Sequence, residues 1–170
     1  MAKRVLGRTA VVGFFVSLLV HLLTVAGIDV TRWVPHVWGL HVGMFVVLFA
    51  FVLSSRKILG RRVTLGDLTS GIPNWTGALI IALFVYGTVN LVWCAYVLHD
   101  GVPDIINGQY VLSAHGRVLL RITESEYHLH RAHELRMFSG LWLLAYCVSG
   151  LYFLFWREPA SIFEGGAKTA

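Results

Sequence analysis

Residues 123–156 read TESEYHLHRAHELRMFSGLWLLAYCVSGLYFLFW, and this stretch decides the fold because it is typical of one long helix. Its first four residues form a capping box, in which the Thr123 hydroxyl accepts the N–H of Glu126 and the Glu126 carboxylate reaches back. No proline follows until Pro159, so the pattern predicts a helix over 124–156, roughly 50 Å long. The last two thirds are apolar enough to cross a bilayer, whereas the first third is expected to stand outside it.

Three further apolar runs precede this helix, at residues 9–28, 37–54 and 75–98. Each is close to the roughly 20 residues that a bilayer core requires. Only 14% of the chain is charged, against roughly 25% in soluble domains. The first run is longer than the apolar part of a signal peptide, so we expect it to be retained. The sequence predicts an all-α membrane protein, a single integral membrane domain over residues 1–170, built as an up-down bundle of four transmembrane helices.

A small extramembrane β-hairpin is expected between helices three and four, over about residues 109–122. Gln109–Ala114 and Arg117–Ile122 have the composition of short strands. The two residues between them, His115 and Gly116, suit a tight turn, because glycine adopts positive φ freely and histidine tolerates it better than most residues.

The lysines and arginines predict the orientation. Nine of the 14 lie at the N-terminus, between helices two and three, or in the C-terminal tail. The positive-inside rule therefore places both termini in the cytoplasm and the protein in the inner (cytoplasmic) membrane, with the lipid bilayer as its surroundings. The basic residues lie at the ends of apolar runs, which argues against nucleic acid as a partner.

Polar side chains inside the apolar runs gather toward one end, the predicted outer half. His21 and His41 lie in helices one and two, and Asn90 and Ser139 lie in helices three and four. A polar group in hydrocarbon needs a partner, so we expect these four side chains to make contacts inside the bundle. The spacing of Gly39 and Gly43 predicts that another helix approaches helix two closely.

Four functions remain open from the residues. The leading one is an accessory, assembly or interaction subunit that would bind a membrane protein partner and for which no cofactor is expected. The second is a redox subunit with His21 and His41 as axial ligands to haem b. The third is a metal site at His130 and His133, which share a helix face. In the fourth, the outer histidines respond to pH. No motif of a known enzyme class is present, so catalytic residues are not predicted.

A resemblance covers roughly the last third of the chain. The hairpin, the Glu-x-Glu-Tyr helix start and the segment Leu135-Arg136-Met137-Phe138-Ser139-Gly140-Leu141-Trp142 look like a stretch of uncharacterised small bacterial four-helix membrane proteins. Those proteins often have His where this chain has Leu141, so no ligand role is carried over to that position. The resemblance implies a common origin and brings no established activity.

Overall fold

The computed structural model describes residues 2–59, 73–99 and 101–155, without the side chains of 56–59. Its four α-helices are α1 (Ala2–Val25), α2 (Gly39–Leu59), α4 (Trp75–Val97) and α5 (Glu124–Phe155). Among the described residues these four helices are each long and apolar enough to cross a membrane. The described residues do not include Arg61 and Arg62, which belong to the basic segment between the second and third apolar runs, or the C-terminal tail beyond α5.

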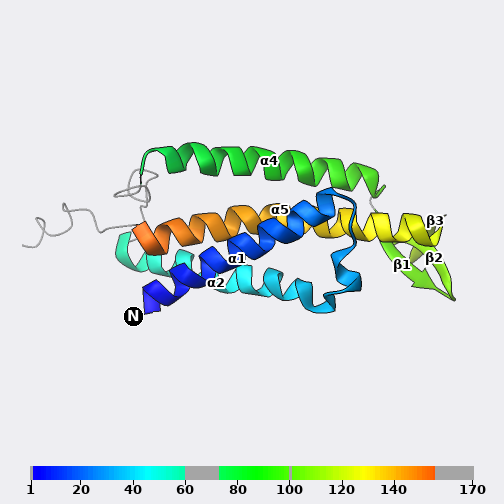
Figure 1. Cartoon of the computed structure of the whole chain (residues 1–170), viewed down its shortest axis with the longest axis horizontal. Helices are drawn as coiled ribbons and strands as arrows, with labels where there is room; N and C mark the ends of the chain where they lie inside the picture. Colours follow the sequence, from blue (N-terminus) through cyan, green and yellow to red (C-terminus); the bar gives the residue numbers. More distant parts are fainter. Residues whose placement is uncertain (1, 60–72, 100, 156–170) are drawn as a thin grey trace, which may run out of the picture.

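Helix α5 is central to the fold. The other three helices all pack against it, α1 most extensively, and successive helices run in alternating directions along the long axis (Figure 1). Leu135 and Trp142 of α5 have no exposed surface, so the core is built around this helix. A central helix that contacts three others must be buried over much of its surface, which explains why its polar residues meet partners from several elements.

The link between α1 and α2 is compact. Gly27 turns the chain with φ of 77°, and two short 3₁₀ helices follow, η1 (Val30–Arg32) and η2 (Pro35–Trp38). Asp29 caps η1, since its Oδ1 accepts from both the N–H and the hydroxyl of Thr31, at 3.0 and 2.5 Å. The link therefore folds back over the end of α1 as an ordered element.

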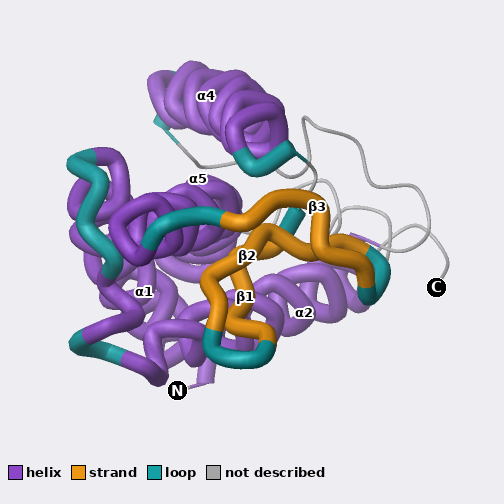
Figure 2. Tube along the Cα trace, turned by 90° about the vertical axis from the view of Figure 1, so that its right-hand side faces the viewer, coloured by secondary structure: helices purple, strands orange, loops and turns teal. Residues whose placement is uncertain are grey.

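The sequence predicts a two-stranded hairpin between α4 and α5, whereas the structure has a sheet of three strands there. The sheet between α4 and α5 has three antiparallel strands in the order β1 (Val102–Ile106), β2 (Gln109–Ala114) and β3 (Arg117–Arg121) (Figure 2). The extra strand arises because Asn107 and Gly108 adopt positive φ, 52° and 76°, and so form a two-residue hairpin turn.

The predicted turn at the other end of β2 is confirmed, with φ of 51° at His115 and 76° at Gly116. The predicted cap of α5 is confirmed as well: the Thr123 N–H donates to Glu126 Oε2 at 2.7 Å, and the Glu126 N–H donates to Thr123 Oγ1 at 3.2 Å. Packing of Tyr110 against Tyr127, with ring centroids 5.1 Å apart, then fixes the sheet to the first turn of α5.

Candidate functional site

His21 joins three helices at the level where α1, α4 and α5 meet. This residue is buried, with only 3% of its surface exposed. The ring Nδ1 lies 2.8 Å from Ser139 Oγ on α5, and the ring Nε2 lies 2.5 Å from the Tyr86 hydroxyl on α4. Both ring nitrogens therefore have a hydrogen-bond partner within the protein, and neither is left to bind a ligand without displacing one of them.

Asn90 and Arg136 form a second link, between α4 and α5. The Arg136 Nε donates to Asn90 Oδ1 at 2.7 Å, and the Asn90 amide donates to the Arg136 carbonyl at 3.0 Å. The sequence predicts contacts for Asn90 but none for Arg136, whose guanidinium bonds to this residue of the third apolar run. Gly140 allows this arrangement, since a Cβ there would lie 2.9 Å from Asn90 Nδ2 and 3.6 Å from His21 Cε1.

His41 lies in a different environment. Its Nδ1 accepts a hydrogen bond from Trp142 Nε1 at 2.8 Å, and its ring is surrounded edge-on by those of Trp38, Phe45 and Phe138. We expected His21, His41 and Asn90 to converge, but only His21 and Asn90 meet at Gly140. The difference arises because α2 and α4 pack against different parts of α5.

The spacing of the two glycines of α2 predicts the close approach of another helix. No backbone atom of another helix, however, lies within 4 Å of a Cβ at either position. A Cβ at Gly39 would meet no atom within 4 Å, and a Cβ at Gly43 would lie 2.6 Å from the Tyr146 hydroxyl. That hydroxyl instead donates to the Leu40 carbonyl at 2.8 Å. Gly43 thus makes room for an aromatic side chain of α5 rather than for a neighbouring helix.

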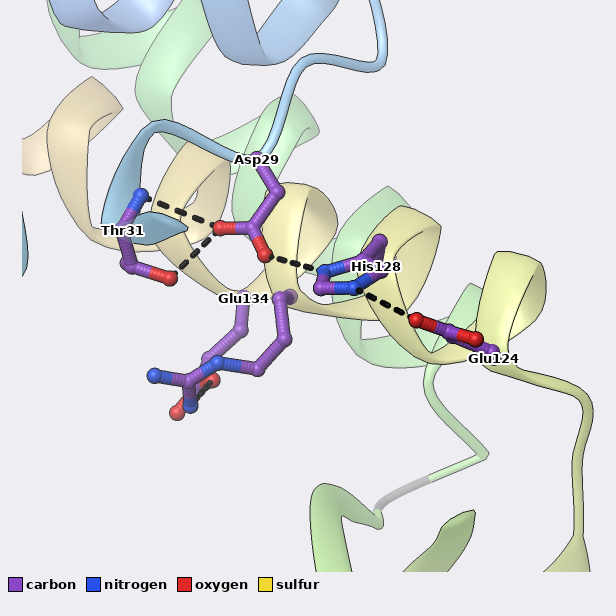
Figure 3. Close-up of polar contacts among 6 residues, drawn as sticks. Asp29, Thr31, Glu124, His128 and Glu134 are labelled. Atoms are coloured by element: carbon purple, nitrogen blue, oxygen red, sulfur yellow. Dashed lines mark hydrogen bonds and ion pairs between the residues drawn. The ribbon is translucent and has the colours of Figure 1, made fainter. Parts of the chain in front are cut away.

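His128 fastens the link between α1 and α2 to the first part of α5. Its Nδ1 lies 2.8 Å from Asp29 Oδ2, and its Nε2 lies 3.9 Å from Glu124 Oε1, so the ring is held between two carboxylates (Figure 3). One helical turn further along α5, Arg131 and Glu134 form an ion pair of 2.6 Å. This end of the molecule is therefore held by charged and titratable groups.

The residues predicted to bind a metal ion are His130 and His133, and their rings differ from that of His21 in having a nitrogen without a partner. The Nδ1 atoms of both are buried without a hydrogen-bond partner, so each ring has one nitrogen whose hydrogen-bonding capacity is unsatisfied. Within residues 2–59, 73–99 and 101–155, however, no group of three or more His, Cys, Asp or Glu side chains is arranged to hold a metal ion. The metal hypothesis stays a prediction that rests on two histidines.

Hollows along the helices are lined mainly by apolar side chains. One lies between α1 and the α1–α2 link and includes Val16, Leu19, Val37 and Leu40. Another lies between α1 and α5 and includes Val11, Phe14, Leu151 and Leu154. The polar groups inside the bundle thus face one another across helix contacts, and these two hollows offer hydrocarbon. A third hollow, beside the α1–α2 link, is instead lined by Arg32, Glu124 and His128.

Sequence reasoning missed Tyr86 and Arg136 as members of the polar contacts. Tyr86 could have been found, because it precedes Asn90 by one helical turn and so shares its face. Compared with known protein families, curated proteins and solved structures, the chain gives no match. The site therefore has to be interpreted from its own geometry.

Proposed function

We propose that this chain is an integral protein of the inner membrane, an up-down bundle of four transmembrane helices that serves as an accessory or interaction subunit. Four apolar helices of sufficient length and the distribution of lysine and arginine support the membrane placement, with both termini cytoplasmic. In this orientation the sheet and the His128 contacts lie on the outer side.

One observation carries the assignment of a non-catalytic role: the polar side chains inside the bundle bond to one another across helices. His21 bonds to Ser139 and Tyr86, Asn90 bonds to Arg136, and Trp142 bonds to His41. Each contact joins two helices, as interhelical hydrogen bonds in membranes do. The interior chemistry therefore maintains the fold, and the function is expected at the surface.

A haem b protein is the alternative that the geometry favours least. A bis-imidazole iron requires one free nitrogen from each of two facing rings. Both nitrogens of His21 are engaged, and His41 shares none of the hydrogen-bond partners of His21. Binding would require Tyr86 or Ser139 to move away from His21.

A pH-responsive protein is the second candidate, favoured by the position of His128 between Asp29 and Glu124. A positive charge on the His128 ring would lie between the carboxylates of the α1–α2 link and of α5, 2.8 Å from Asp29 Oδ2 and 3.9 Å from Glu124 Oε1. Other groups near this site are Tyr127, whose ring contacts His128, and Arg32, which lines a hollow together with His128. The carboxylate of Glu134 also interacts electrostatically with Asp29. A His128→Gln variant keeps a hydrogen-bonding side chain and removes the charge, so it would abolish any response of the link to acid.

The deciding experiment is purification in mild detergent after crosslinking in cells, followed by identification of attached proteins. The proposed function expects a partner in stoichiometric amount and an absorbance scan from about 350 to 600 nm without a haem band. A stoichiometric haem band that is lost in both His21→Ala and His41→Ala would overturn it. About one metal ion per chain, removed by His130→Ala with His133→Ala, would do the same.

The orientation has its own test. Gln109 is exposed at the start of β2, so a Gln109→Cys variant offers a thiol on the sheet. Cys94 and Cys147 are both buried, which keeps the background low. We expect an impermeant thiol reagent to label this position in intact cells. Labelling only after the inner face is opened would show that the sheet is cytoplasmic.

A further inference from the structure

The hollow beside the α1–α2 link is lined by charged and polar side chains from two elements. Arg32 comes from η1 of the link, and Glu124, Ser125 and His128 come from the start of α5. The volume of the hollow is about 520 Å³. This lies within the range of ligand sites, roughly 300–1,000 Å³, so the hollow has room for a small polar group.

One side of the hollow presents two hydrogen-bond acceptors. His128 Nδ1 lies 2.8 Å from Asp29 Oδ2, and because an ionised carboxylate only accepts, the proton of the neutral ring is assigned to Nδ1. The other ring nitrogen, Nε2, is then an acceptor. It lies 3.9 Å from Glu124 Oε1, which is too far for a hydrogen bond between the two (Figure 3). A cation with two N–H donors can bond to both atoms at once.

The other charged group of the hollow is the Arg32 guanidinium. Arg32 is exposed, and within the described part of the chain its side chain forms no hydrogen bond or ion pair. It is therefore not paired with Glu124, although both side chains line the same hollow. Separated opposite charges select a ligand that carries both, since a purely anionic ligand would face Glu124 and a purely cationic one would face Arg32.

The surroundings of the hollow favour a lipid as this ligand. Trp33 of the link is 69% exposed, as expected for an aromatic residue at the boundary between lipid and water. Val30 and Val34 each lie two residues from Arg32. Together with Leu19 of α1 they line a second hollow, which is apolar. A charged hollow and an apolar hollow on the same short link match the head group and an acyl chain of one molecule.

We propose that these two hollows bind one phospholipid whose head group carries a phosphate and a primary ammonium group. Arg32 binds the phosphate, to which a guanidinium donates two parallel hydrogen bonds. The ammonium donates to Glu124 Oε1 and His128 Nε2, and the apolar hollow holds an acyl chain. A quaternary ammonium has no N–H, and a glycerol head group has no positive charge, so neither replaces the primary ammonium. The proposal rests on the membrane placement in the proposed function but not on the accessory role.

Native mass spectrometry of the full chain in detergent tests the proposal. The probes are phosphatidylethanolamine, phosphatidylcholine and phosphatidylglycerol with identical acyl chains. We expect phosphatidylethanolamine to bind about fivefold more tightly than the other two, the factor that one exposed charge pair contributes. In Glu124→Gln this preference is expected to disappear, without weaker binding of phosphatidylglycerol. In Arg32→Gln all three lipids are expected to bind more weakly, because all three carry the phosphate.

Matched variants control for the change of charge and of volume. Asp104→Asn and Arg117→Gln alter an exposed carboxylate and an exposed guanidinium of the sheet, and neither should change lipid binding. Leu19→Trp is expected to fill part of the apolar hollow and to weaken the binding of all three lipids. Leu22→Trp alters an exposed residue of α1 outside this hollow and should have no effect. Thermal unfolding of each variant confirms that it remains folded.

Three outcomes would overturn the proposal. The first is equal binding of the three lipids by the wild-type chain. The second is a preference for phosphatidylethanolamine that survives in Glu124→Gln. The third concerns the source of the head group: if glycerophosphoethanolamine, which has no acyl chains, displaces the lipid at equal concentration, then the hollow binds a soluble ligand and the lipid assignment is wrong.

These outcomes are distinct from those that test the accessory role. If a partner is captured from cells but the three lipids bind equally, then the accessory role stands and the lipid site fails. If the lipid preference is found but no partner is captured, then the lipid site stands and the accessory role fails. Extraction of the chain from membranes by alkaline carbonate would contradict the membrane placement, and both proposals would fail with it.

Discussion

The two helices α1 and α4 both pack against α5, but they do so by different means. The buried face of α1 consists mostly of small side chains. Four of them recur every three or four residues, Gly7, Ala10, Gly13 and Ser17, and Thr24 follows two turns later. The buried residues of α4 are few, and three of them, Gly87, Asn90 and Cys94, lie in its second half. Close packing holds α1 along its length, whereas α4 is held mainly by polar contacts near one end. The comparison teaches that one fold combines both ways of joining helices.

The largest effect is expected from Gly13→Ala. A Cβ at this position would lie 2.7 Å from Cδ1 of Tyr146, and moving that ring would break its hydrogen bond to Leu40. Overpacking of this kind costs about 2 kcal/mol of the free energy of unfolding. Thermal unfolding in detergent measures the loss. Gly77→Ala on α4 is the control, since a Cβ there meets no atom within 4 Å; equal losses in the two variants would contradict the packing of α1.

A somewhat smaller effect is expected from Asn90→Leu, and it should be confined to α4. The substitution keeps the approximate size of the side chain but removes the acceptor for Arg136 and the donor to its carbonyl. Hydrogen bonds to charged groups contribute about 1.5 kcal/mol or more. Amide exchange should increase in α4 and remain unchanged in α1. Thr88→Ala, an exposed hydroxyl on the same helix, serves as the control. Equal loosening of α1 would argue against a separate attachment of α4.

The smallest effect is expected from Tyr86→Phe, which removes only the hydroxyl that meets His21 Nε2. Interhelical hydrogen bonds in membranes average about 0.6 kcal/mol. A double-mutant cycle with His21→Ala isolates this pair from the contact between His21 and Ser139. A coupling energy near zero would show that α4 depends on Asn90 alone.

The sequence predicted those parts of the fold that depend on local patterns. The start of α4 at Trp75 and the cap at Thr123 follow from hydropathy and from capping chemistry. It missed β1, because Pro103 and Asp104 are unusual in a strand, although the Asn107-Gly108 turn was a local signal for it. Local patterns therefore recover elements more readily than they recover pairings between elements.

The contacts of the candidate site depend on the packing of whole helices, which local patterns do not determine. Hydropathy gives no reason to expect the charged Arg136 among the contacts of the apolar runs, yet its long side chain reaches Asn90 from α5. His41 and His21 lie in the same half of the chain's apolar runs, but the path of α2 brings His41 to Trp142 instead of to His21. Polar contacts of His21, His41, Asn90 and Ser139 were predictable. The participation of Tyr86 and Arg136, and the pairings themselves, were not.

Helix α5 continues without interruption from the sheet to the far end of the helical part, over 32 residues. At 1.5 Å per residue this is a rod about 48 Å long. The sheet and the α1–α2 link are fixed to one end of the rod, and the contacts with α1 and α4 lie further along it. We therefore expect a displacement of the sheet to be carried along this rod to the contacts of α5 with α1 and α4.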